Sequence, residues 1–152
     1  MYKATVRALM RYSVKQLNAG DASLFLRLAH PDAFIAFPGD NSWATMFRPV
    51  VKGREQHATH RGHAEITAFA ERFTSEGVKF TIEDILVNGP PWNTRIALRV
   101  ASFLPGPDGS DDYNNRAIAL LHTRWGRVTA WEDYEDTERV AAWDRRVAAS
   151  VR

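Results

Sequence analysis

The stretch YNNRAIALLHTRWGRVTAWEDYED, residues 113–136, decides the fold of this chain. We interpret it as two long β-strands that are joined at Trp125-Gly126 and form a hairpin. Because successive side chains of a strand point to opposite faces of a sheet, each strand presents two different sets of residues. One face of the hairpin combines small side chains with an aromatic ring and a carboxylate: Ala117, Ala119, Trp131 and Asp133.

Small side chains on this face leave room beneath the hairpin, and the carboxylate of Asp133 faces that room. Burying a carboxylate without a partner is costly, so a carboxylate in this position needs either a counter-charge or a chemical role. We therefore expect a concave pocket whose floor is this hairpin, and we expect the function of the protein in that pocket.

The composition is ordinary for a globular protein. The 152 residues suit one domain, 1–152, with 45% hydrophobic and 25% charged residues. The absence of a long apolar run and of a signal-peptide pattern predicts a bacterial-type cytoplasmic protein with no membrane partner. The net charge is +2 with scattered basic residues, so we expect no nucleic-acid partner. The chain has no cysteine, which excludes disulfides and thiolate metal sites.

The rest of the chain predicts helices before the hairpin and strands that lead into it. Four strands in succession with short turns form an antiparallel meander, and the helices gather on one side of it. The predicted fold class is therefore α+β: a curved, mainly antiparallel sheet wrapped around N-terminal helices. The expected elements are helices over 4–18, near 22–29, over 62–76 and from 137 onward, and strands over 33–37, 78–87 with a bulge near Glu83-Asp84, and 94–104.

The segment 39–61 shows no clear periodicity and is long for a loop of a compact domain. It carries Trp43, Met46 and Phe47, whose side chains are costly to leave in water. We interpret it as a flap over the mouth of the pocket, with Trp43 in contact with the ligand. Two alternatives remain open, namely a loop that covers the edge of the core and a contact in a dimer.

Three histidines follow one another at a spacing of three residues: His57, His60 and His63. Zinc-binding histidines of a helix prefer positions four apart, because residues at that spacing share a face. Histidines three apart spread around the axis, so we expect no metal site, and we expect no other cofactor. A histidine that reaches the pocket as an acid or base is the alternative.

Four segments resemble the SnoaL-like group of the nuclear-transport-factor-two-like superfamily, which has an α+β cone fold. They are LNAGD at 17–21, DAFIAF at 32–37, GHAEITAFAERF at 62–73 and GRVTAWEDYED at 126–136. The pattern is nearest to limonene epoxide hydrolase and polyketide cyclase-like proteins. The resemblance implies this fold, but the superfamily includes both enzymes and noncatalytic binding modules, so the site must decide the function.

The resemblance carries one catalytic group onto this chain. The aspartate of the W-x-D-Y-x-D segment of limonene epoxide hydrolase matches Asp133. The accompanying Arg and Asp of that enzyme fall on Ala97 and Arg99, so the second acid is missing. Its water-positioning Tyr and Asn fall on Ile35 and Phe37, and the general base of ketosteroid isomerase also falls on Phe37. Both complete catalytic sets are therefore absent.

Three polar residues receive candidate roles, because we place all three on the inner face. Asp133 is the candidate general acid or base, since an apolar pocket raises the pKa of a carboxyl. Arg99 is its candidate charge partner, and Asn115 is the candidate donor to a substrate oxygen. The alternative roles are structural, namely an Arg99–Asp133 ion pair and a hydrogen bond of Asn115 to a neighbour. The predicted ligand contacts are Phe37, Trp43, Phe69, Phe73, Ala117, Ala119 and Trp131.

The outer face of the hairpin is too apolar to be left in water, so we expect two copies to form a homodimer through this face. Its residues are Ile118, Leu120, His122, Val128, Ala130 and Tyr134.

Two hypotheses for the function follow. The first is a cofactor-free isomerase, cyclase or hydrolase that acts on a hydrophobic oxygenated substrate through Asp133. The second is a noncatalytic dimeric module that binds ligands or has a structural role. The incomplete catalytic sets favour the second hypothesis, and the surviving acid with the aromatic segment 39–61 favours the first.

Overall fold

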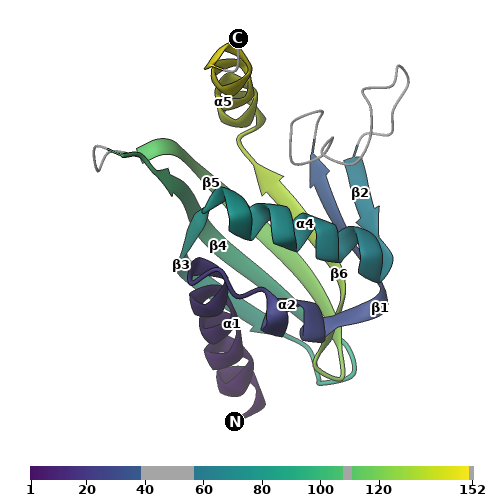
Figure 1. Ribbon diagram of the computed structural model, residues 1–152. Helices are drawn as coiled ribbons and strands as arrows, with labels where there is room; N and C mark the ends of the chain where they lie inside the picture. The colour runs from purple at the N-terminus through teal and green to yellow at the C-terminus, as the bar shows by residue number, and fades with distance from the viewer. Residues whose placement is uncertain (39–56, 108–110, 151–152) are drawn as a thin grey trace.

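The computed structural model describes residues 1–38, 57–107 and 111–150, which fold into helices and one sheet (Figure 1). Within these residues the helices are α1 (Tyr2–Asn18), α2 (Ser23–Leu28), α4 (Gly62–Glu76) and α5 (Thr137–Ser150). The strands are β1 (Ala29–Pro38), β2 (His57–Arg61), β3 (Lys79–Asn88), β4 (Thr94–Pro105), β5 (Asp111–Arg124) and β6 (Arg127–Glu135).

The strands form one curled, unclosed sheet in the order β2-β1-β6-β5-β4-β3. All neighbouring strands are antiparallel except β1 and β6, which run parallel. The helices α1, α2 and α4 lie against one face of the sheet, which we call the inner face, and α5 extends from the end of β6 (Figure 1). The predicted α+β fold, with a meander from β3 to β6, is confirmed.

The hairpin of β5 and β6 turns at Trp125 and Gly126, as the sequence predicts. Both residues have positive φ angles, 51° and 78°, which match a two-residue hairpin turn between twisted strands. The register pairs Ala119 with Asp133. Residues directly opposite each other in an antiparallel pair share a face, so this pairing sets Asp133 on the inner face.

The side of each helix that carries the periodic apolar residues packs toward the sheet, as predicted. In α1 and α4 the buried positions recur at spacings of three and four, which places them on one side of each helix. α4 ends at Gly77, which adopts a left-handed φ of 77° that a residue without Cβ reaches readily. The buried residues are Val6, Met10, Ser13 and Leu17 in α1, and Ile66, Phe69, Ala70 and Phe73 in α4.

Two irregularities bend the strands. The register of β3 against β4 shifts between Ile82 and Asp84, which confirms the predicted bulge. A second shift, between His122 and Thr123 of β5, was not predicted. It pairs Val128 with Thr123 and turns Val128 toward the core. Placing Val128 on the outer face was therefore wrong, because one residue of slip exchanges the faces of a strand.

The inner face carries two clusters of buried apolar residues. One gathers under α4 around Ile66 and Phe69, and the other gathers under α1 around Met10 and Leu98. Trp131 packs against both clusters, so the middle of β6 is the place where the two halves of the core meet.

The edge strand β2 corrects one expectation. Residues 57–61 were assigned to a loop, but they pair with β1 in an antiparallel register that sets His60 opposite Ile35. The five residues HATHR have no apolar alternation of their own, so pairing with the edge of β1 defines the strand. The rest of that segment, including Trp43, Met46 and Phe47, lies outside the described residues, and the flap stays a prediction.

Among the described residues, no helix is both long enough and apolar enough to cross a membrane.

Candidate functional site

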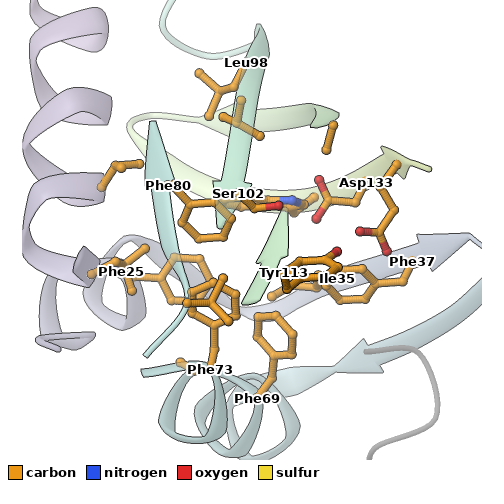
Figure 2. Close-up of a pocket in the computed structure, with 18 residues that line it drawn as sticks. Phe25, Ile35, Phe37, Phe69, Phe73, Phe80, Leu98, Ser102, Tyr113 and Asp133 are labelled. Carbon is orange, nitrogen blue, oxygen red and sulfur yellow. The ribbon is translucent and has the colours of Figure 1, made fainter. Parts of the chain in front are cut away.

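A cavity lies on the inner face, between the sheet and the helices α1, α2 and α4 (Figure 2). It holds about 860 Å³ of empty space, which includes the part open to solvent. Most of its described lining is aromatic or aliphatic. The polar side chains among the described lining residues are Ser102, Tyr113, Asp133 and Glu135.

Small side chains of β5 lie across from the two acids of β6. Ala117 lies opposite Glu135 and Ala119 lies opposite Asp133 in the register of β5 with β6. Ala117 lines the cavity, so a larger side chain at this position would fill part of that space. The sequence pattern of small residues across from a carboxylate therefore corresponds to a hollow at this place.

Aromatic rings form one continuous wall of the cavity. Ring centroids are 5.2 Å apart for Phe37 and Phe69, 5.9 Å for Phe69 and Phe73, and 4.7 Å for Phe73 and Phe80. These separations are typical of aromatic packing. Figure 2 shows Phe69 and Phe73 projecting from α4 on the side opposite Asp133.

The predicted ligand contacts divide between the cavity and its surroundings. Phe37, Phe69, Phe73, Ala117 and Trp131 line the cavity. Ala119 does not line it, because its methyl group is fully buried in the cluster under α1.

Asp133 is half-buried by its exposed surface, and its carboxyl group faces the cavity (Figure 2). Burial raises the pKa of Asp133 from 3.8 to about 7, because the charged form loses its hydration. The neighbouring indole N–H of Trp131 lowers this pKa only in part. At neutral pH the carboxyl group therefore exists in both protonation states, which is the condition that general acid or base catalysis needs.

Trp131 lines the cavity two residues before Asp133 on β6. Its ring meets Phe25 edge-on, with the ring centroids 5.7 Å apart. Its indole nitrogen is buried and makes no hydrogen bond of normal geometry within the described part of the chain. The indole therefore gives the carboxylate of Asp133 weak support, which agrees with the direction of the pKa shift.

Glu135 is a second carboxylate at the cavity, and the sequence analysis did not select it. It follows Asp133 by two residues on β6, so the two side chains share the inner face. Its carboxylate oxygen Oε2 lies 3.4 Å from Nδ2 of Asn115. The alternation along β6 was the signal that could have identified it.

Arg99 does not reach Asp133, so its predicted role as charge partner is wrong. The register pairs Val100 with Ala117 and Leu98 with Ala119, which gives the inner face to Leu98 and Val100. Arg99 therefore points outward, where its Nε lies 2.9 Å from a carboxylate oxygen of Glu83. The residues of β4 had been assigned to the opposite faces, because only the pairing with β5 fixes which set points inward.

Asn115 is buried on the inner face but does not line the cavity. Its side-chain amide donates to the hydroxyl of Tyr113 at 3.0 Å and to the backbone carbonyl of Asp136 at 3.0 Å. These bonds fasten the junction between β6 and α5. Asn115 thus matches the structural alternative of the sequence analysis rather than the predicted substrate donor.

The three histidines separate in the structure. His60 is buried, and its ring stacks on Phe69 with a centroid distance of 5.5 Å. His63 is exposed on α4, and the side chain of His57 lies outside the described residues. Among the described residues, no group of three His, Cys, Asp or Glu side chains is placed to hold a metal ion.

A curled sheet with helices on its inner face and an apolar cavity between them defines an α+β cone protein. Comparison with protein families matches residues 10–131 to the family described as SnoaL-like domain, so the chain belongs to that family. The resemblance inferred from the sequence is confirmed. A search of curated proteins finds no match.

Solved structures share this fold at low sequence identity. An NTF2-like protein of unknown function from Burkholderia pseudomallei K96243 is 17% identical, with a TM-score of 0.67 over 91% of this chain and 95% of that chain. TerC, co-crystallized with polyporic acid, is 18% identical, with a TM-score of 0.66 over 91% and 96%. AclR, a putative hydroxylase from Streptomyces galilaeus, is 15% identical, with a TM-score of 0.59 over 91% and 83%.

Proposed function

We propose that this protein binds a hydrophobic, oxygenated small molecule in the cavity and that Asp133 transfers a proton to or from it without a cofactor. One observation carries the proposal: a carboxyl group with a pKa of about 7 faces an apolar, aromatic-lined cavity. Structural acids are normally paired with a base, and no charged group contributes to the pKa shift of Asp133. TerC, whose crystals contain polyporic acid, supports small-molecule binding by this fold.

The chemistry follows from the position of the acid. In its ionised form Asp133 accepts a proton from a carbon next to a carbonyl group, and the protonated carboxyl then returns that proton to a neighbouring atom. The apolar lining lowers the local dielectric constant around the carboxyl group, which strengthens electrostatic effects in the cavity. Isomerisation, cyclisation and hydration all use such a proton transfer, so the proposal covers this group of reactions.

Ligand binding is tested with the neutral hydrophobic dye Nile red and a cavity-filling variant. Wild-type protein is expected to bind the dye with a large rise in fluorescence, and Ala117→Phe is expected to abolish the rise, because the ring occupies the cavity. Ala101→Phe is the matched control, since Ala101 lies on the outer face opposite Arg116. Equal dye binding by the two variants would show that the dye, and the proposed ligand, bind elsewhere.

Proton transfer is tested with 2-tetralone as a ketone probe in deuterated water. Wild-type protein is expected to accelerate the exchange of hydrogen for deuterium next to the carbonyl group, and Asp133→Asn is expected to bring the rate back to the buffer background. The dye assay on the same variant checks that the cavity is intact. Acceleration that survives in the variant would rule out Asp133 as the proton carrier.

A noncatalytic binding module is the second candidate function. The observation that favours it is the loss of both predicted helpers, since Arg99 lies outside the cavity and Asn115 is engaged at the start of α5. A normal dye assay together with an exchange rate at background, for wild-type protein, would favour this candidate.

We also propose that two copies of the chain associate through the outer face of the sheet. Leu86, Ile118 and Tyr134 support this, because they leave 63%, 42% and 49% of their surface exposed on that face. Light scattering coupled to size exclusion is expected to give the mass of a dimer, and Ile118→Lys is expected to give a monomer. A monomeric wild-type protein would contradict the proposal.

A further inference from the structure

We propose that the molecule bound in the cavity is a hydrophobic organic cation, with an ammonium group beside Asp133 and an apolar body along the aromatic wall. This inference rests on the proposed ligand binding and deepens it, because it assigns the ligand a chemical class.

The described lining of the cavity contains acids but no base. Asp133 and Glu135 contribute carboxyl groups from β6, and none of the described lining residues is Lys, Arg or His. Three arginines of β4, β5 and α5 are engaged elsewhere. Arg99 and Arg116 both approach Glu83 on the outer face, at 2.9 and 4.0 Å, and Arg139 pairs with Asp136 at 3.5 Å. A positively charged ligand supplies a counter-charge to Asp133, whose pKa is shifted only by burial and by the indole of Trp131.

The apolar part of the lining suits the same ligand. Cations are attracted to the faces of aromatic rings, and this attraction is larger where water is excluded. Rings approach the cavity from several elements, so an ammonium group beside Asp133 meets ring faces as well as the carboxylate. The rings are Phe25 on α2, Phe37 on β1, Phe69 and Phe73 on α4, Phe80 on β3, Tyr113 on β5 and Trp131 on β6.

Anionic ligands are disfavoured by the same arrangement. A carboxylate or phosphate in the cavity would lie near one or two like charges and would find no basic side chain among the described lining residues. A neutral ligand avoids this repulsion but leaves the charge of Asp133 without a partner above its pKa. The three ligand classes therefore differ in affinity, and they differ in how that affinity depends on Asp133.

The experiment compares three probes of one shape class by isothermal titration at about pH 8, where Asp133 is mostly ionised. They are (2-naphthylmethyl)trimethylammonium, its neutral carbon analogue 2-neopentylnaphthalene, and the anion 2-naphthylacetate. The cation is expected to bind most tightly and the anion least tightly. Asp133→Asn is expected to weaken the cation about tenfold and to leave the neutral analogue unchanged.

A pH series on wild-type protein gives the same answer without a substitution. The ammonium probe carries no titrating proton, so its affinity is expected to fall as Asp133 is protonated between about pH 8 and about pH 5.5, while that of the neutral analogue stays constant. Glu135 and Tyr113 are the other titratable groups of the described lining. The variant Glu135→Gln shows which acid causes the loss of affinity. Its affinity for the ammonium probe is expected to fall with the same midpoint pH as that of the wild-type protein.

The outcomes distinguish this inference from the function on which it rests. Binding of the neutral analogue together with weak binding of the cation would overturn the inference and would support an uncharged ligand in the same cavity. Failure of all three probes and of Nile red would overturn both. Cation binding that is unaffected by Asp133→Asn and by pH would place the charge away from Asp133 and would also contradict the inference.

Discussion

Charged side chains have different surroundings on the two faces of the sheet. On the outer face Glu83 meets Arg99 at 2.9 Å, and both side chains keep part of their surface in water. On the inner face Asp133 faces the cavity without a base among the described lining residues, and burial raises its pKa to about 7. Solvent screens charges on the first face more strongly than on the second, where most of the lining is apolar. Carboxylates of one sheet therefore lie beside water and arginine on one side and beside an apolar cavity on the other.

Neighbouring residues of β4 give the largest expected contrast between the faces. Leu98 points inward and is nearly fully buried, so Leu98→Ala removes buried methyl groups and leaves a void. We expect a loss of about 2–5 kcal/mol in the free energy of unfolding, measured by urea denaturation. A loss below about 1 kcal/mol would mean that the inner face at β4 is not packed as described.

The pH dependence of the free energy of unfolding tests the raised pKa of Asp133, with an expected effect of similar size to that of Leu98→Ala. The folded-state pKa of Asp133 lies above the unfolded value of 3.8, so the folded protein holds this proton more tightly. The stabilisation of the folded state by this bound proton is fully present below pH 3.8 and is lost as the pH rises through about 7. The loss amounts to about 4 kcal/mol at most.

Asp133→Asn removes this titration, so its stability relative to wild type is expected to increase between about pH 4 and about pH 8. Urea denaturation across that range measures the difference. A difference that does not change with pH would place the pKa of Asp133 close to its unfolded value.

Arg99→Ala is expected to have the smallest effect. The ion pair with Glu83 is partly exposed, so its loss is expected to lower the free energy of unfolding by about 0–1 kcal/mol, and Nile red binding is expected to be unchanged. Urea denaturation and the dye assay measure the two quantities. A loss of unfolding free energy comparable to that of Leu98→Ala, or weaker dye binding, would indicate that Arg99 reaches the cavity, as the sequence analysis predicted.

Local patterns predicted most of the fold. The turn at Trp125-Gly126, the end of α4 at Gly77 and the bulge after Ile82 each follow from the residues at that place, and each is confirmed. The strand β2 was missed, because its pairing depends on β1 and not on its own residues. Sequence patterns thus identify elements that depend on their own residues, and they miss a strand that depends on pairing with its neighbour.

Alternation within a strand predicted which residues of that strand share a face. It did not predict how residues of different strands lie relative to one another. Asp133 and Trp131 follow from alternation within β6, and the same alternation would also have identified Glu135. Arg99 failed because its face depends on the register between β4 and β5, which the sequence does not state. Asn115 was placed on the correct face, but its hydrogen bonds to Tyr113 and to the backbone of Asp136 come from the junction with α5.

The most direct measurement is the pKa of Asp133 itself. Protein with ¹³C-labelled aspartate carboxyl groups is titrated by NMR, and the resonance that is absent from Asp133→Asn identifies this residue. A midpoint at about 7 is the predicted result, and it would establish a buried acid that is available for proton transfer at neutral pH. A midpoint near 3.8 would show a solvated or paired carboxylate and would contradict the central claim.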